Sequence, residues 1–144
     1  MEGGTYRWMS PELLDPEEFG LGNGRHTKNS DRYALGMVVY EVLSGRPPFF
    51  RHNSHLAVAK VLKGERPERL QGVEGTWFTD DVWSILERCW ERSPGDRPRV
   101  NDVLQCLEGA STSRSPPRAT PDPPKRSSEP DSEEDSIFSF SSHP

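Results

Sequence analysis

Ser30-Asp31-Arg32-Tyr33-Ala34-Leu35-Gly36-Met37-Val38-Val39-Tyr40-Glu41-Val42-Leu43-Ser44-Gly45 is the stretch that decides the fold. Residues 33–43 within it are apolar on nearly every side of a helix, which is typical of a helix in the middle of a domain. Ser30 or Asp31 is the expected N-cap, and Gly45 is the expected left-handed residue that ends the helix. One helix cannot surround itself, so the segments beside it must wrap around it.

The flanking segments carry helix signals and no strand signals. Ser10 is placed to cap a short helix in which Pro11 takes the first position, where its missing N–H is not needed. Ser54 and Thr79 are placed to cap two further helices, and a last apolar pattern at helical spacing ends at Leu107. The expected helices are residues 10–14, 31–44, 55–63, 80–90 and 100–107. No segment alternates strictly between apolar and polar residues, so the sequence predicts an all-α cluster around the 31–44 helix.

Residues 110–144 differ in composition from the rest of the chain. About half of them are Pro or Ser, and their only large apolar side chains are Ile137, Phe138 and Phe140. Such a segment cannot bury enough apolar surface to offset the entropy of ordering. The sequence therefore predicts one helical unit over residues 1–109 and a disordered, Ser/Pro-rich acidic tail over residues 110–144.

Composition and charge exclude several classes of function. The chain has a formal net charge of −5 and no basic patch of the kind that binds nucleic acid. Two cysteines, Cys89 and Cys106, are too few for a disulfide framework or a four-ligand zinc site, and no metal site is expected. No signal peptide or apolar span of membrane length occurs, so neither nucleic acid nor membrane is expected as a partner. The expected location is the cytoplasm, with the nucleus as the alternative.

Three separated motifs point to a family. They are Gly3-Gly4-Thr5-Tyr6-Arg7-Trp8-Met9-Ser10-Pro11-Glu12, then Asp31-x-Tyr33-x-x-Gly36 leading to Pro48-Phe49, and finally Cys89-Trp90 with Pro94-x-x-Arg97-Pro98. In this order and spacing they resemble the C-terminal part of a eukaryotic protein-kinase domain, in which Ser10-Pro11-Glu12 takes the place of the Ala-Pro-Glu motif. The resemblance covers about residues 3–109. It implies the C-terminal helical subdomain of the protein-kinase fold, most similar to the tyrosine-kinase-like group.

The resemblance assigns structural roles to three charged residues. Glu12 is expected to form a buried ion pair with Arg97, whose guanidinium fork can bind a carboxylate through two parallel bonds. The alternative is two unrelated surface charges. Asp31 is either a helix N-cap or, as in the family, the side chain that anchors the backbone of the catalytic loop. Arg99 stands where a Thr or Ser cap is common, which predicts a shortened last helix.

The resemblance also places the acceptor site at the start of the chain. Thr5 corresponds to the hydroxyl that bonds with the catalytic Asp in Ser/Thr kinases. The pocket for the residue after the phosphoacceptor is expected to be shaped by Tyr6, Arg7 and Trp8. Gly4-Thr5 favours Ser/Thr over Tyr as the acceptor, because tyrosine kinases usually have Pro near this position.

The motifs that perform phosphoryl transfer do not occur in the 144 residues. There is no His-Arg-Asp and no Asp-Phe-Gly, and the glycines of residues 20–24 do not have the Gly-x-Gly-x-x-Gly spacing. We therefore expect no catalytic residue in this chain, no bound cofactor and no activity of the chain alone. ATP and Mg²⁺ would belong to the complete domain, and Met1 is either a true start or the result of a truncated gene model.

Two classes of function follow. The first is a fragment of a Ser/Thr kinase domain, with protein substrates or regulators as partners and with apolar surface where missing helices would pack. The second is a non-catalytic, pseudokinase-like module for protein interaction. The tail offers candidate phosphosites before Pro or near acids, at Ser115, Thr120, Ser128 and Ser132. The alternative for these four is a merely solvated Ser-rich tail, and residues 137–140 are a candidate segment for docking to a partner's groove.

Overall fold

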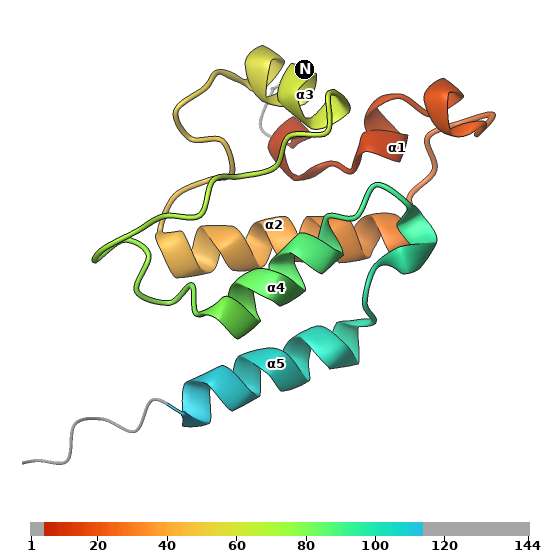
Figure 1. Cartoon of the computed structure of the whole chain (residues 1–144). Helices are drawn as coiled ribbons and strands as arrows, with labels where there is room; N and C mark the ends of the chain where they lie inside the picture. Colours follow the sequence, from red (N-terminus) through yellow and green to blue (C-terminus); the bar gives the residue numbers. More distant parts are fainter. Residues whose placement is uncertain (1–4, 114–144) are drawn as a thin grey trace, which may run out of the picture.

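The computed structural model describes residues 5–113, in which helices joined by loops are the regular secondary structure (Figure 1). Its α-helices are α1 (Pro11–Leu14), α2 (Lys28–Ser44), α3 (Ser54–Leu62), α4 (Asp80–Cys89) and α5 (Val100–Thr112). Its short 3-10 helices are η1 (Tyr6–Trp8), η2 (Glu17–Phe19) and η3 (Pro94–Asp96). No strand occurs among these residues, which confirms the predicted all-α class.

Helix α2 is the central element. In Figure 1, α4 and then α5 lie on one side of α2, whereas α1 and α3 lie on the other. The contacts agree with this view, because α4 packs against both α2 and α5, while η1 packs against both α2 and α3. The chain therefore wraps around the 31–44 helix, as the sequence predicts.

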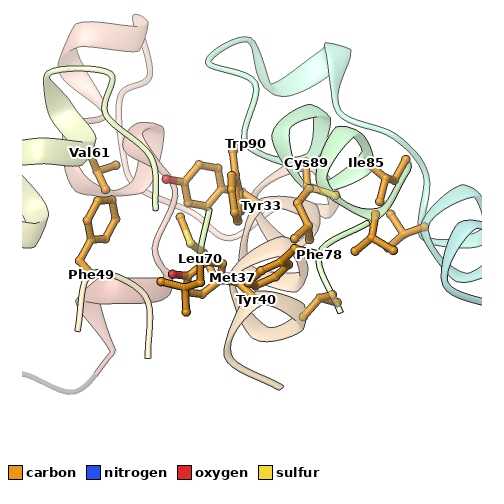
Figure 2. Close-up of a cluster of buried hydrophobic side chains, with 14 of the residues drawn as sticks. Tyr33, Met37, Tyr40, Phe49, Val61, Leu70, Phe78, Ile85, Cys89 and Trp90 are labelled. Carbon is orange, nitrogen blue, oxygen red and sulfur yellow. The ribbon is translucent and has the colours of Figure 1, made fainter. Parts of the chain in front are cut away.

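The core is built where α2 faces α4 (Figure 2). Tyr33, Met37 and Tyr40 of α2 are at most 1% exposed. The Tyr40 ring stacks on Phe78 at 5.3 Å between centroids and meets the edge of Trp90 at 6.1 Å. Offset stacking and edge contacts of this kind are the favoured arrangements of aromatic pairs. The aromatic cluster thus joins α2, the loop before α4 and the end of α4.

The start of α2 lies earlier than predicted. Thr27 is the N-cap, and it exchanges two hydrogen bonds with Ser30: the Thr27 hydroxyl accepts from the Ser30 backbone N–H at 3.1 Å, and the Ser30 hydroxyl accepts from the Thr27 N–H at 2.8 Å. The prediction of Ser30 or Asp31 as the cap was wrong, because this reciprocal pair begins the helix before its apolar run. Gly45 ends the helix in the left-handed region with φ 71°, as predicted.

The caps of the other helices were predicted with mixed success. Thr79 caps α4 as expected, its hydroxyl accepting from the backbone N–H of Val82 at 3.3 Å. Asn53 caps α3, not Ser54, because the Asn53 side-chain oxygen accepts from the backbone N–H of Leu56, the third residue of the helix, at 2.9 Å. Ser10 takes the N-cap position of α1, but its hydroxyl makes no capping bond.

Helix α5 is longer than predicted. It continues to Thr112, past the expected end at Leu107, so residues 110–112 are helical and do not belong to a disordered tail. Arg99 does not shorten it, because the Asp102 carboxylate accepts from the Arg99 backbone N–H at 3.1 Å and completes the first turn. Ala110 packs against the core and supports the last turn. The remainder of the predicted tail lies outside the described residues.

Within residues 5–113, no helix is both long and apolar enough to span a bilayer.

Gly36 allows α2 and α4 to approach closely. A Cβ at this position would lie 2.7 Å from Cys89 Cβ and 2.7 Å from Trp90 Nε1. We predict that Gly36→Ala lowers the free energy of unfolding by about 1–3 kcal/mol, because neither neighbour is the free end of a flexible side chain. The matched control is Gly109→Ala within α5, where a Cβ would meet nothing within 4 Å. The control should be neutral or stabilising by up to about 1 kcal/mol in urea unfolding; equal midpoints for the two variants would contradict the prediction.

Candidate functional site

Glu12 and Arg97 meet in the interior, although they are far apart in the sequence. Arg97 donates from Nη1 to Glu12 Oε1 at 2.6 Å and from Nη2 to Glu12 Oε2 at 2.9 Å. Each residue is only 3% exposed. The structure therefore brings together the two side chains that the resemblance pairs, in the bidentate geometry that only a guanidinium provides.

Arg97 also binds two backbone carbonyls. Its Nε donates to Glu91 O at 2.9 Å, and its Nη1 donates to Asn29 O at 2.9 Å. Its guanidinium lies 5.1 Å from the ring centroid of Tyr33. One side chain thus connects α1, the first turn of α2 and the turn after α4.

The Glu12 carboxylate stays ionised in this setting. Burial acts to raise its pKa, but the hydrogen bonds and charge of Arg97, together with a backbone hydrogen bond, outweigh burial and hold the pKa below its ordinary value of 4.5. The pair is therefore an ion pair at neutral pH.

The predicted acceptor residues divide into two kinds. Thr5 and Tyr6 are exposed, and Tyr6 is 40% accessible. Trp8 packs against the core and donates from Nε1 to Glu41 Oε2 at 2.9 Å, while Arg7 donates to backbone carbonyls of residues 48–52. We therefore keep Thr5 and Tyr6 as candidate acceptor contacts. Arg7 and Trp8 attach residues 5–8 to the rest of the domain, because their N–H groups donate hydrogen bonds to it.

Asp31 lies exposed in the first turn of α2, where a negative charge complements the helix dipole. It is not the N-cap, since Thr27 takes that place. Its family role as an anchor of the catalytic loop stays a prediction. The candidate phosphosites at 115, 120, 128 and 132 lie outside the described residues.

The described residues offer no metal site and no reactive thiol in the core. Between residues 5 and 113, no group of three or more His, Cys, Asp or Glu side chains is placed to hold a metal ion. Burial raises the pKa of the Cys89 thiol to about 11, so this side chain is protonated at neutral pH.

Sequence reasoning missed the side chains and carbonyls that hold residues 5–8, the candidate acceptor segment, in place. Glu41 carries no motif of its own, and the partners of Arg7 are backbone carbonyls. The one available signal was Pro47-Pro48, a chain breaker that predicts an unusual backbone before α3.

A Ser-Pro-Glu motif anchored by a buried Arg, on helices packed around a central apolar helix, defines the C-terminal helical subdomain of a protein kinase. A family model described as protein tyrosine and serine/threonine kinase matches residues 2–107. The chain belongs to this family.

Individual relatives carry serine/threonine-kinase names. Serine/threonine-protein kinase VIK of Arabidopsis thaliana is 33% identical over 108 residues, which are 74% of this chain and 22% of that protein. Probable serine/threonine-protein kinase gdt2 of Dictyostelium discoideum is 36% identical over 106 residues, 73% of this chain and 6% of the relative. Serine/threonine-protein kinase mos of Patiria pectinifera is 30% identical over 107 residues, which are 73% of this chain and 27% of that protein. The chain thus spans less than a third of the length of each of these relatives.

We predict that Arg97→Ala destabilises the protein by about 3–5 kcal/mol, because it leaves the Glu12 charge buried and unpaired. The matched control is Arg92→Ala, which breaks the Arg92–Glu18 pair, whose side chains are 48% and 45% exposed. The control should cost no more than about 1 kcal/mol in thermal or urea unfolding. A melting curve left unchanged by Arg97→Ala would contradict this prediction.

Acid should weaken the wild-type protein partly through Glu12. Because the folded-state pKa of Glu12 is depressed, its contribution to stability is present above the unfolded-state pKa and is lost as the pH falls through the folded-state pKa. Glu12→Gln should lower stability at pH 7 and flatten the decline of the unfolding free energy below about pH 5. Urea unfolding of both proteins at a series of pH values measures this. If the unfolding free energies of the two proteins declined in parallel below about pH 5, Glu12 would not be the group responsible.

Proposed function

We propose that residues 3–109 form the acceptor-binding and scaffold part of a Ser/Thr protein kinase domain. The observation that carries the proposal is the anchoring of the N-terminal segment. Thr5 and Tyr6 face solvent, while Trp8, Arg7 and Glu12 tie the same segment to α2, the loop before α3 and Arg97. Holding a reactant in a fixed place is the main contribution that this side of a kinase makes to phosphoryl transfer.

Serine and threonine are the proposed acceptors. Gly4-Thr5 carries the hydroxyl typical of Ser/Thr kinases at this position, and Thr5 is exposed in the structure. The named relatives are serine/threonine kinases, whereas the matching family model includes tyrosine kinases too. Tyrosine as the acceptor is the less favoured alternative.

We infer that ATP and Mg²⁺ are bound by other residues of a complete domain. Phosphoryl transfer needs a Gly-rich loop over the phosphates, a Lys, metal-holding side chains and a catalytic Asp, none of which occurs as a motif in the 144 residues. The 144-residue chain alone is therefore proposed to be inactive.

An apolar groove on α2 supports packing against further kinase residues. Val38 and Val42 of the central helix are 46% and 73% exposed, and Trp77 beside them is 51% exposed. They line a pocket of about 320 Å³ between α2, α4 and α5, whose other walls include Val82 and Leu107. Contiguous apolar surface of this kind marks an interaction site. We propose that it receives the part of the domain that precedes these residues in longer kinases.

A non-catalytic interaction module is the second candidate. The observation that favours it is the continuous core around α2, with Tyr33 and Met37 fully buried. A core of this kind is compatible with cooperative folding of the chain by itself. Deleting residues 131–144 should then abolish capture of one protein partner, and a pull-down unaffected by the deletion would weigh against this candidate.

The kinase proposal can be tested by substitution into a relative. We predict that a chimera of the Arabidopsis kinase VIK, with residues 3–109 in place of its matching segment, phosphorylates Ser/Thr peptides and not Tyr peptides. The 144-residue chain, assayed alone with Mg-ATP, should transfer no phosphate. Thr5→Ala should lower the activity of the chimera about 10–100-fold, because the acceptor loses its positioning hydroxyl.

ATP-analogue binding and thermal unfolding of the chimera serve as folding controls. A chimera that folds and binds nucleotide but phosphorylates no acceptor would contradict the proposed function. Equal activity of the Thr5→Ala chimera would contradict the role of Thr5 alone.

A further inference from the structure

Arg7 reaches from η1 to a loop more than forty residues later in the chain. Its Nη1 donates to Pro48 O at 3.2 Å and to Phe49 O at 2.8 Å, and its Nη2 donates to His52 O at 2.5 Å. Three carbonyls of one short loop thus converge on a single guanidinium. The partners are backbone atoms, so the contact depends on the backbone conformation of the loop and not on its side chains.

The loop has an unusual backbone that explains this convergence. Phe49 has φ 55°, the only non-glycine residue with positive φ between residues 5 and 113. A bulky residue adopts this region only where its surroundings enforce it. Here the Phe49 ring is buried at 8% exposure, and the His52 N–H donates to Phe49 O at 2.9 Å and closes the turn. Core packing from one side and Arg7 from the other therefore hold the loop.

Arginine is the side chain suited to this contact. Its planar fork presents several N–H donors in fixed directions. Lysine would bring a single ammonium group to the same place. One ammonium could not donate in the same directions to three carbonyls that are bound by both Nη1 and Nη2 of the guanidinium.

We propose that Arg7 is a positioning residue, which sets Thr5 and Tyr6 in place by locking η1 to residues 48–52. This inference rests on the proposed function, because it deepens the account of the acceptor segment. Trp8 follows Arg7 directly and binds Glu41 on α2. Arg7 therefore fixes η1 to the loop before α3, while Trp8 fixes it to the central helix.

Trp8 supplies a spectroscopic reporter for the test. Nitrogen-15 spectra of the 144-residue chain should show the indole N–H signals of its four tryptophans, at positions 8, 77, 83 and 90. In Arg7→Lys, the Trp8 signal should shift or broaden, because its bond to Glu41 depends on the place of η1. The His52 amide should exchange with solvent at least about tenfold faster, while the Trp83 and Trp90 signals stay in place. Arg7→Gln is the second variant and should show the same pattern.

The matched control is Arg46→Lys. Arg46 lies near the same loop, 4.8 Å from the Phe50 ring centroid, and pairs with Glu74 at 2.8 Å. Its replacement should leave both the Trp8 signal and the His52 amide unchanged. The proposal is overturned if Arg7→Lys leaves them unchanged too, or if the signals of Trp8, Trp83 and Trp90 all move together, since that would indicate general loosening.

The outcome is independent of the kinase chimera. A chimera that transfers no phosphate, together with the expected spectra, would remove the proposed function and leave the Arg7 contact standing. An active chimera with unchanged spectra would remove the positioning role alone.

Discussion

The buried guanidinium of Arg97 is the interaction on which the rest of the structure depends. An arginine that is 3% exposed is tolerated only when its charge is paired and its N–H groups are satisfied. The carboxylate of Glu12 and the carbonyls of Asn29 and Glu91 meet that requirement from three separate segments. Because each partner is needed to offset the cost of burial, the guanidinium fixes the positions of the three segments relative to one another.

A second constraint is the volume around α2. The absence of a side chain at Gly36 lets the end of α4 approach, so Trp90 reaches the ring of Tyr40. The opposite situation holds at Val38 and Val42, where the same helix remains open. Helix α2 is thus enclosed on the side of α4 and exposed along the groove toward α5, and this asymmetry is the basis for the proposal that the groove packs against further kinase residues.

The sequence predicted the existence of the five α-helices and some of their ends, but it missed the ends that depend on contacts outside the apolar pattern. Thr79 and Gly45 were found because a cap and a left-handed glycine act locally. The start of α2 was missed because the reciprocal bonds of Thr27 precede its apolar run. The end of α5 was missed because Ala110 is helical through packing against the core. The pairing of Glu12 came from resemblance to a family, since no local pattern joins positions so distant.

The partners of Arg7 show why the acceptor segment was the hardest part to predict. Every residue has a carbonyl, so no sequence pattern marks the three that converge on one guanidinium. Their convergence requires the left-handed backbone at Phe49, which in turn requires the core that buries its ring. In the proposed arrangement, the place of Thr5 and Tyr6 is set by Arg7 and Trp8, whose polar groups bind the rest of the domain. A segment held from the loop before α3, from Glu41 and from Arg97 loses little further freedom on binding, and such preorganisation supports the proposed role of Thr5 and Tyr6 in positioning a hydroxyl.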